Sequence, residues 1–441
     1  MFGAMFSTPE ATARTGDDAW LQAMLDFESA LATAQSEAGI VPAGAAADIA
    51  AHCRAAEFDS AAIGERAVSS ATPVIALVKD LTALVGPDSR PHVHKGATSQ
   101  DVIDTAAMLV TRDVLALILG DLREAARECA RLADEHRDTV LVARSLLQQA
   151  LPTTFGLRCA GWLTALDEAI AGLERVPLAV QFGGAAGTLA SLGPDGPRVL
   201  AGLAERLGLA EPVLPWHTDR TRIAELAGAL GAVSGVLGKI ALDVELHAQT
   251  EVGELTEGKP GGSSAMPHKQ NPATSVLITA ATHRVPGLVA TLLSAMPQPY
   301  ERAAGAWQSE WEPLTELLRL TAGAARRTRE LLSGLRVHPD RMAANLELTR
   351  GLVLAENAAA RLAGALGRTE AQELVAELCR RTVERGSTLR AELLAEPKVR
   401  DVLSEQDVIA ATSASDYLGA ASDFIDRALA AHTGHTGLEK R

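Results

Sequence analysis

The chain has 441 residues, of which 47% are hydrophobic but only 3% aromatic, and this composition favours helices over a β-sandwich or barrel. The net charge of −14 argues against a nucleic-acid-binding surface, and four scattered cysteines without a C-x-x-C pair suit a reduced, cytoplasmic protein. No signal peptide and no apolar run of 18 or more residues stands out, so no membrane span is expected. A lone His92-x-His94 pair gives no reason to expect a metal site.

The N-terminal part is predicted to be a helical domain over residues 1–107. Residues 1–13 are small and polar, and we expect them to be extended. Apolar side chains then recur on one side of a helix predicted from about Asp17 to Ala38, which Gly39 ends. Shorter helices, broken by glycine and proline, are expected over 43–85.

The first polar motif is His94-x-Gly96-x-Thr98-Ser99-x-Asp101. Thr98 and Asp101 match the capping box, in which the side chains of the first and fourth residues satisfy each other's exposed N–H groups. A long helix is therefore predicted to follow, as far as about residue 138. A plain helix start is enough to explain this motif on its own.

A heptad pattern precedes residue 245 and predicts a long helix of a bundle. The apolar seam consists of Ile223, Leu226, Leu230, Val233, Leu237, Ile240 and Val244. The next two seam positions are His247 and Glu251, so the stripe becomes polar just before a glycine-rich loop. Further long helices are expected near 155–175, 272–295 and 311–335. We assign 108–339 to this central bundle and 340–441 to a third, helical domain.

The most informative stretch is GGSSAMPHKQNP, residues 261–272, which we call the signature loop. Its glycines allow a tight turn and a close approach of the backbone to a ligand. Asn271 and Pro272 suit the start of a helix, whose N-terminal N–H groups attract carboxylates, and Lys269 adds a full charge. The spacing of glycine and lysine is wrong for a nucleotide P-loop, so a small organic anion is the expected ligand.

The pattern G-S-S-x-M-P-x-K-x-N-P, met from Gly262 to Pro272, resembles the signature of the fumarase/aspartase superfamily. The resemblance implies an all-α, three-domain fold with a central long-helix bundle, assembled as a homotetramer whose active sites are shared between subunits. It implies no cofactor and no metal. It also implies that Ser263 transfers the proton and that Lys269 stabilises the negative charge that develops. The substrate-binding residues that it implies are His94, Thr98, Ser99, Arg144, Ser145, Asn271 and Arg302.

Two of these assignments have competing interpretations. Arg302 is a plausible ligand of a third substrate carboxylate, but an ion pair with Glu301 or Glu310 would explain it equally well. Trp307 and Trp311 are four residues apart and are expected to pack on each other.

The chain departs from the lyases of the superfamily at one block. Those lyases carry R-[ST]-H, whose histidine acts as a general acid and pairs with a glutamate, whereas this chain has Arg144-Ser145-Leu146 and Val276. Leucine cannot exchange a proton, so a leaving group that needs an external proton would be poorly served. We expect Leu146 and Val276 to face the same pocket.

The missing pair favours one family of the superfamily, the 3-carboxy-cis,cis-muconate cycloisomerases, in which a substrate carboxylate adds to a double bond of the same molecule. The strings PWHT at 215–218 and ERAAGAWQSEW at 301–311 resemble the same family. The resemblance implies a cytoplasmic enzyme of aromatic-acid catabolism, on the protocatechuate branch of the β-ketoadipate pathway. The alternatives are a β-elimination lyase acting on adenylosuccinate or a related adduct, and a structural protein that kept the fold.

Overall fold

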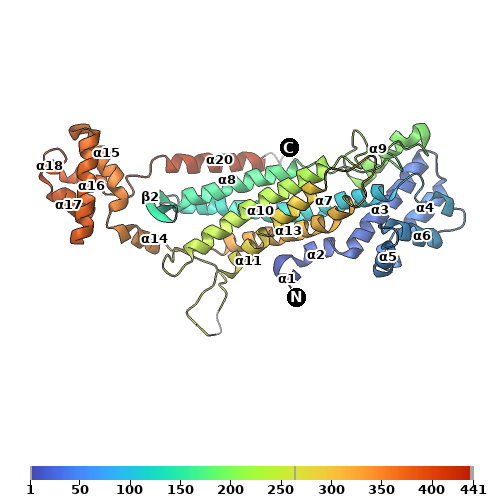
Figure 1. Ribbon diagram of the computed structural model, residues 1–441, viewed down its shortest axis with the longest axis horizontal. Coiled ribbons are helices and arrows are strands. Elements are labelled where there is room, and N and C mark those ends of the chain that lie inside the picture. Colours follow the sequence, from blue (N-terminus) through green and yellow to red (C-terminus); the bar gives the residue numbers. More distant parts are fainter. Residues whose placement is uncertain (1, 263–264, 438–441) are drawn as a thin grey trace. The chain divides into compact units, whose positions relative to one another are not determined.

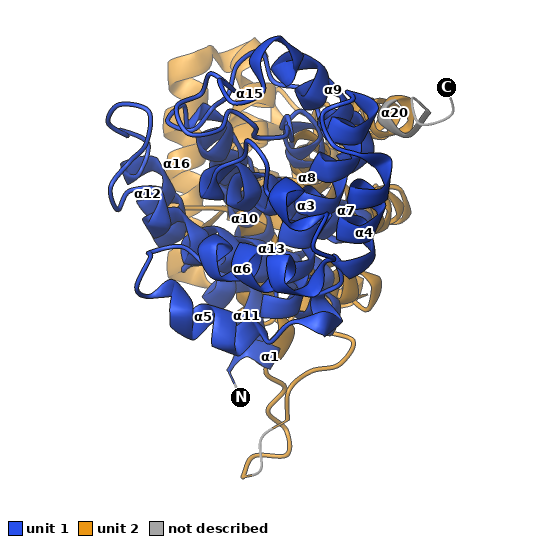
Figure 2. Ribbon diagram, turned by 90° about the vertical axis from the view of Figure 1, so that its right-hand side faces the viewer, with its two compact units in different colours: residues 1–122, 169–238, 277–327 blue, residues 123–168, 239–276, 328–441 orange. Residues whose placement is uncertain are grey.

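The computed structural model describes residues 2–262 and 265–437, of which the last three are described by their backbone alone, and it is mostly helical (Figure 1). This confirms the predicted fold class. The chain divides into two compact units, which Figure 2 distinguishes by colour. Unit 1 comprises residues 1–122, 169–238 and 277–327, and unit 2 comprises residues 123–168, 239–276 and 328–441.

The helices are numbered in chain order, and five of them (α7, α8, α10, α11 and α13) contribute residues to both units. The α-helices as far as α13 are α1 (Gly3–Phe6), α2 (Pro9–Arg14), α3 (Asp17–Glu37), α4 (Ala43–His52), α5 (Ser60–Ala67), α6 (Val74–Leu84), α7 (Ser99–Glu135), α8 (Phe155–Glu174), α9 (Gly196–Leu207), α10 (Thr221–His247), α11 (Ala273–Thr282), α12 (Val285–Ser294) and α13 (Trp311–Ser333). Because the boundary between the units cuts across long helices, the division into domains at 107 and 339 stays a prediction.

Each of the remaining elements is shorter than α8. The later α-helices are α14 (Pro339–Leu346), α15 (Ala355–Leu366), α16 (Arg368–Arg385), α17 (Leu389–Ala395), α18 (Pro397–Arg400), α19 (Glu405–Ala411) and α20 (Ala421–Gly437). The 3₁₀ helices are η1 (Ala55–Glu57), η2 (Arg90–His92), η3 (Gly193–Asp195), η4 (Gln308–Glu310), η5 (Glu347–Thr349) and η6 (Leu352–Leu354). The strands are β1 (Val140–Ser145), β2 (Gln148–Thr154), β3 (Leu255–Thr256) and β4 (Arg336–Val337).

The predicted heptad seam lies on α10, and none of its seven side chains is more than 1% exposed. By length and composition alone, the stretches Thr221–His247 and Ala273–Ser294 could each cross a membrane, although the sequence reading expected no such segment. The seam of α10 is instead buried inside the chain, which is how a core helix of a soluble fold behaves.

Two predictions about helices were wrong. Within the stretch predicted to be extended, residues 3–6 and 9–13 are helical. Thr8 caps α2 by accepting the Ala11 N–H, and Pro9 stands in its first turn. The helix predicted over 272–295 is two helices, since Pro286 lies in the first turn of α12 and cannot donate a backbone hydrogen bond to a preceding turn.

A β-hairpin that the sequence analysis missed lies in unit 2. Strands β1 and β2 pair antiparallel, with Ser145 opposite Gln148, so Leu146 and Leu147 form the turn. Both leucines have positive φ values, 51° and 64°, as the two central residues of a type I′ turn require. Asn-Gly is the usual pair in such turns, so Leu-Leu gave no signal of one.

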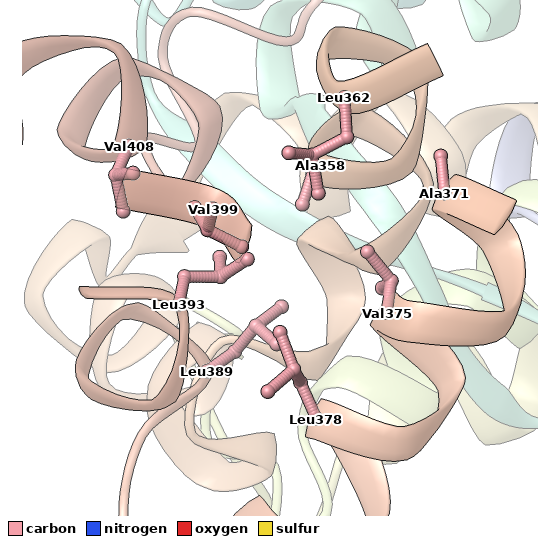
Figure 3. Packing of buried hydrophobic residues seen from close by; sticks show 9 residues of the cluster. All are labelled: Ala358, Leu362, Ala371, Val375, Leu378, Leu389, Leu393, Val399 and Val408. Atoms are coloured by element: carbon pink, nitrogen blue, oxygen red, sulfur yellow. The ribbon is translucent and has the colours of Figure 1, made fainter. Parts of the chain in front are cut away.

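The helices α15–α19 of unit 2 enclose a hydrophobic core of their own. Figure 3 shows its nine buried side chains directed toward one another from these helices. They are Ala358, Leu362, Ala371, Val375, Leu378, Leu389, Leu393, Val399 and Val408. None of the predicted site residues lies in this part of the chain.

Candidate active site

Two predicted substrate-binding residues, Thr98 and Arg302, meet in unit 1. One Nη of Arg302 donates to Thr98 Oγ1, and the other donates to the carbonyl oxygens of Gly184 at 3.3 Å and Ala185 at 3.1 Å. Among the described residues Arg302 forms no ion pair. The competing interpretation therefore fails for Glu310, which is instead paired with another arginine.

That other pairing belongs to a buried polar cluster beside this site. Arg220 donates to both Asp104 and Glu310, at distances of 2.5 to 3.1 Å, and all three side chains are buried. Trp307 Nε1 donates to Asp104 at 3.0 Å, and its ring packs edge-on against Trp311, with centroids 4.9 Å apart. The expected packing of the two tryptophans is confirmed.

The predicted capping box is half formed. The Thr98 N–H donates to Asp101 Oδ2 at 3.0 Å, as predicted, and α7 begins at Ser99. The Thr98 hydroxyl, however, accepts the Arg302 hydrogen bond instead of capping the helix. Ser99 is partly exposed, and its hydroxyl has no partner among the described residues. The Thr98 hydroxyl thus contacts an arginine that forms no ion pair with any described residue.

His94 is held by a carboxylate that sequence reasoning missed. Its Nδ1 lies 2.6 Å from Oε1 of Glu28, which projects from α3 and is 1% exposed. Burial opposes charge on the imidazole, but the Glu28 carboxylate outweighs it and raises the pKa of His94. A glutamate among the apolar positions of α3 was the signal that could have identified this pair.

In unit 2, Arg144 is committed to a fully buried carboxylate. Its two Nη atoms lie 3.1 and 2.9 Å from the two oxygens of Glu254, which also accepts from Asn345 at 2.7 Å and from His247 Nδ1 at 2.5 Å. Burial acts to raise the pKa of Glu254, but these hydrogen bonds outweigh it and hold that pKa at about 2. The charge of Arg144 is therefore neutralised inside the chain.

His247, a possible substitute for the absent general acid, is not available for that role. Burial lowers its pKa, and the nearby positive charge of Arg158 acts in the same direction. Its Nδ1–H donates to Glu254, and its Nε2 accepts from Arg158. Since both ring nitrogens are engaged within the chain, His247 has no proton to offer to a ligand.

The signature loop is closed at its base by backbone pairing. The N–H of Gly261 donates to the carbonyl of Asn271 at 2.8 Å, and the reverse bond has the same length. Asn271 is half-buried, while Lys269 is exposed with its backbone N–H bonded to Met266. Ser263, the predicted proton-transfer residue, and Ser264 lie outside the described residues.

The start of α11 differs from the prediction that its N–H groups would face a ligand. The helix begins at Ala273, and the N–H groups of Thr274 and Ser275 donate to the buried carboxylate of Glu257 at 3.0 and 2.8 Å. A carboxylate of the chain itself therefore occupies the place expected for a substrate carboxylate.

The block that distinguishes the chain from the lyases lies at the tip of the hairpin. Ser145 ends β1 and is exposed, and Leu146 is 97% exposed. A side chain so free of contacts does not pack against Val276, which is itself half exposed, so the expected common pocket is not formed within a single chain.

Comparison with known proteins identifies the family. Residues 7–287 match the family described as "Lyase", and residues 351–428 match "Adenylosuccinate lyase C-terminus". The 3-carboxy-cis,cis-muconate cycloisomerase of Pseudomonas aeruginosa is 46% identical over 98% of this chain and 96% of its own. Nitrosuccinate lyase of Streptomyces davaonensis is 43% identical over 95% of this chain and 91% of its own.

A solved structure agrees with the sequence comparison. The crystal structure of the 3-carboxy-cis,cis-muconate lactonizing enzyme from Pseudomonas putida matches with a TM-score of 0.94 at 42% identity, covering 99% of each chain. The chain therefore belongs to the lyase family, the enzyme superfamily that its signature loop predicted, and it is related over nearly its whole length to 3-carboxy-cis,cis-muconate cycloisomerases.

Proposed function

We propose that this protein is a cycloisomerase that interconverts 3-carboxy-cis,cis-muconate and its carboxymuconolactone. The observation that carries the proposal is Leu146, a side chain without an exchangeable proton, at the position where the lyases hold their acid. Relatives with the cycloisomerase activity in their names, such as that of Pseudomonas aeruginosa, support it over nearly the whole chain.

The reaction needs charge stabilisation and one proton transfer. In the forward direction a carboxylate oxygen of the substrate forms a C–O bond to the double bond, and the displaced electron pair moves into the carboxylate next to the other alkene carbon. That carbon then takes a proton, which we assign to Ser263, and the lactone results. The nucleophile is already a carboxylate and, in reverse, leaves as one, so no external acid is required.

The charges of unit 1 suit a tricarboxylate substrate. Arg302 is held by neutral acceptors and keeps its full charge. The charge of protonated His94 is balanced by the Glu28 carboxylate, so we assign His94 to a hydrogen bond with the substrate through its other ring nitrogen. The hydroxyls of Thr98 and Ser99 add donors at the start of α7. We assign Lys269 to the carboxylate that gains charge during the reaction, and Asn271 and Ser145 to hydrogen bonds with the substrate.

The remaining assignments concern assembly. An exposed Leu146–Leu147 tip is a costly way to end a hairpin in water, which supports a homotetramer in which a second copy covers it. We assign Arg144, with its charge neutralised, to holding the hairpin that carries Ser145. A cytoplasmic enzyme of protocatechuate catabolism without a cofactor is consistent with this chemistry.

Elimination of nitrite from nitrosuccinate is the second candidate. Its support is the 43% identity to nitrosuccinate lyase, which equals the identity to two of the cycloisomerases. Nitrite, like a carboxylate, is a stable anion at neutral pH and also leaves without an external proton, so Leu146 does not separate these two functions. It does disfavour the adenylosuccinate-type elimination, whose amine leaving group needs a proton.

Turnover of three substrates by the purified protein tests the proposal. We expect lactone formation from 3-carboxy-cis,cis-muconate, measured as the loss of diene absorbance. We expect no cleavage of nitrosuccinate or adenylosuccinate. Fumarate release from nitrosuccinate with no lactonisation would replace the proposal by the second candidate. Cleavage of adenylosuccinate would contradict the argument from Leu146 itself.

A further inference from the structure

A buried carboxylate ties three segments of unit 1 together. Asp101 is 0% exposed, and its Oδ1 accepts the Gly183 N–H at 3.0 Å and His217 Nε2 at 2.7 Å. Its Oδ2 accepts the N–H groups of Thr98 at 3.0 Å and Gly184 at 2.9 Å. These four donors use the acceptor sites of an ionised carboxylate, and no lysine or arginine among the described residues donates to it.

The bound segments pack so closely that their arrangement is fixed. A Cβ on Gly183 would lie 2.7 Å from Pro215 Cβ and 2.8 Å from His217 Cε1. One on Gly184, whose φ is +68°, would lie 2.9 Å from a backbone carbonyl oxygen. His217 is anchored a second time, because Gln100 Nε2 donates to its carbonyl oxygen at 2.7 Å.

The segments that Asp101 holds also form the seat of Arg302. We call this seat the guanidinium slot: Thr98 Oγ1 and the carbonyl oxygens of Gly184 and Ala185. The three bonds use three of the five N–H groups of arginine, so Nε–H and one Nη1–H have no partner among the described residues. All three acceptors are neutral, and the guanidinium keeps its charge for an anion.

We propose that Asp101 and His217 are positioning residues that build the guanidinium slot and thereby aim Arg302 at a substrate carboxylate. The inference rests on the proposed function only in naming the anion as a carboxylate of the substrate. Asp101 accepts the N–H groups of Thr98 and Gly184, and Arg302 donates to oxygens of the same two residues, the Thr98 hydroxyl and the Gly184 carbonyl. His217 closes the arrangement by holding Asp101 Oδ1 from the third segment.

A neighbouring pair provides the matched control. Asp104 lies one turn further along α7 and is also buried, and it receives the Nε1–H of buried Trp307 at 3.0 Å. Unlike Asp101, it is paired with Arg220 and has no hydrogen bond to a residue of the slot. Removing the donor to Asp104 therefore reproduces the loss of one buried hydrogen bond without opening the slot.

Chemical rescue of Arg302→Ala by guanidinium chloride, at concentrations that do not denature the protein, tests the inference. An intact slot should bind free guanidinium, so we expect kcat/KM of this variant to recover with a saturable dependence, whereas urea, which is uncharged, restores nothing. When His217→Leu is added to the Arg302→Ala variant, the half-saturating concentration of guanidinium should rise by roughly tenfold or more. Adding His217→Gln, which keeps an N–H donor, or Trp307→Phe should leave it within about threefold.

Equal half-saturating concentrations in the His217→Leu and Trp307→Phe backgrounds would overturn the inference. A saturable, guanidinium-specific rise in the Tm of Arg302→Ala gives the same comparison without turnover, and there too the His217→Leu background should lose the response. If the unsubstituted protein does not lactonise its substrate while the Tm responses differ as expected, the proposed function fails and the slot stands. If the unsubstituted protein lactonises its substrate but guanidinium raises the Tm equally in the His217→Leu and Trp307→Phe backgrounds, the inference about the slot fails and the proposed function stands.

Discussion

Arg302 in unit 1 and Arg144 in unit 2 were both predicted from sequence motifs to bind substrate, but they differ in the charge of their hydrogen-bond partners. Three neutral oxygens hold Arg302, which leaves its charge uncompensated. Arg144 meets both oxygens of the buried Glu254. A charge that is neutralised inside the chain stabilises structure, and one held by dipoles remains available to an anion. The partner of an arginine, and not its motif, decides which of the two it does.

The largest effect on activity is expected from the loss of the assigned proton-transfer residue, and the effects of changing the two arginines can be compared with it. Ser263→Ala removes the assigned proton-transfer group and should lower kcat by roughly 10²- to 10⁴-fold while the protein stays folded. Ser264→Ala, the adjacent control with the same loss of a hydroxyl, should cost less. A larger loss from Ser264→Ala, measured by steady-state lactonisation, would move the proton transfer to the second serine.

If the Arg144–Glu254 pair is structural, breaking it should cause a large loss of stability in unit 2. Glu254→Gln leaves Arg144 partly buried without its partner and should lower the free energy of unfolding by about 3–5 kcal/mol. Denaturant unfolding at fixed protein concentration measures this. Asp113→Asn, which breaks an exposed pair with Arg112, is the control and should cost less than about 1 kcal/mol. Similar costs for the two variants would show that the buried pair is not structural.

Stability should also respond to pH in opposite directions in the two units. The pKa of Glu254 falls from 4.5 to about 2 on folding, so its contribution of about 3 kcal/mol is present above pH 4.5 and is lost as the pH falls toward 2. The pKa of His247 is also lowered, so unit 2 begins to lose stability below about pH 6.5.

The pKa of His94 is raised, so its stabilising contribution is present below about pH 6.5 and is lost as the pH rises above that value. Unfolding free energies measured from pH 2 to 8 should show the acid loss diminished in Glu254→Gln and the alkaline loss diminished in Glu28→Gln. An unchanged pH profile in Glu254→Gln would contradict the assignment for unit 2.

The sequence predicted the elements that depend on local pattern. The heptad spacing of Ile223 to Val244 placed α10, and apolar periodicity placed α3, because burial of one helix face is written in the spacing of its residues. The resemblance carried by the signature loop identified the superfamily. The hairpin was not predicted because its type I′ turn contains Leu-Leu instead of the usual Asn-Gly.

The long-range polar partners could not be predicted in the same way. Glu28 meets His94 across 66 positions, and Glu254 meets Arg144 across 110, and no local pattern connects such residues. The same limit explains the error at α11. Glu257, 17 positions before Thr274, accepts the N–H groups at the start of this helix that were expected to bind a ligand. Only the folded chain shows which charges are already neutralised.

The most direct test is the Michaelis constant of Arg302→Met and Arg144→Met with 3-carboxy-cis,cis-muconate, measured at the temperature where both proteins are folded. We predict that Arg302→Met raises KM by roughly 10- to 100-fold, since a charged hydrogen-bond donor to the substrate is lost. Arg144→Met should raise it much less and should chiefly lower stability. A larger rise in KM for Arg144→Met than for Arg302→Met would contradict the account.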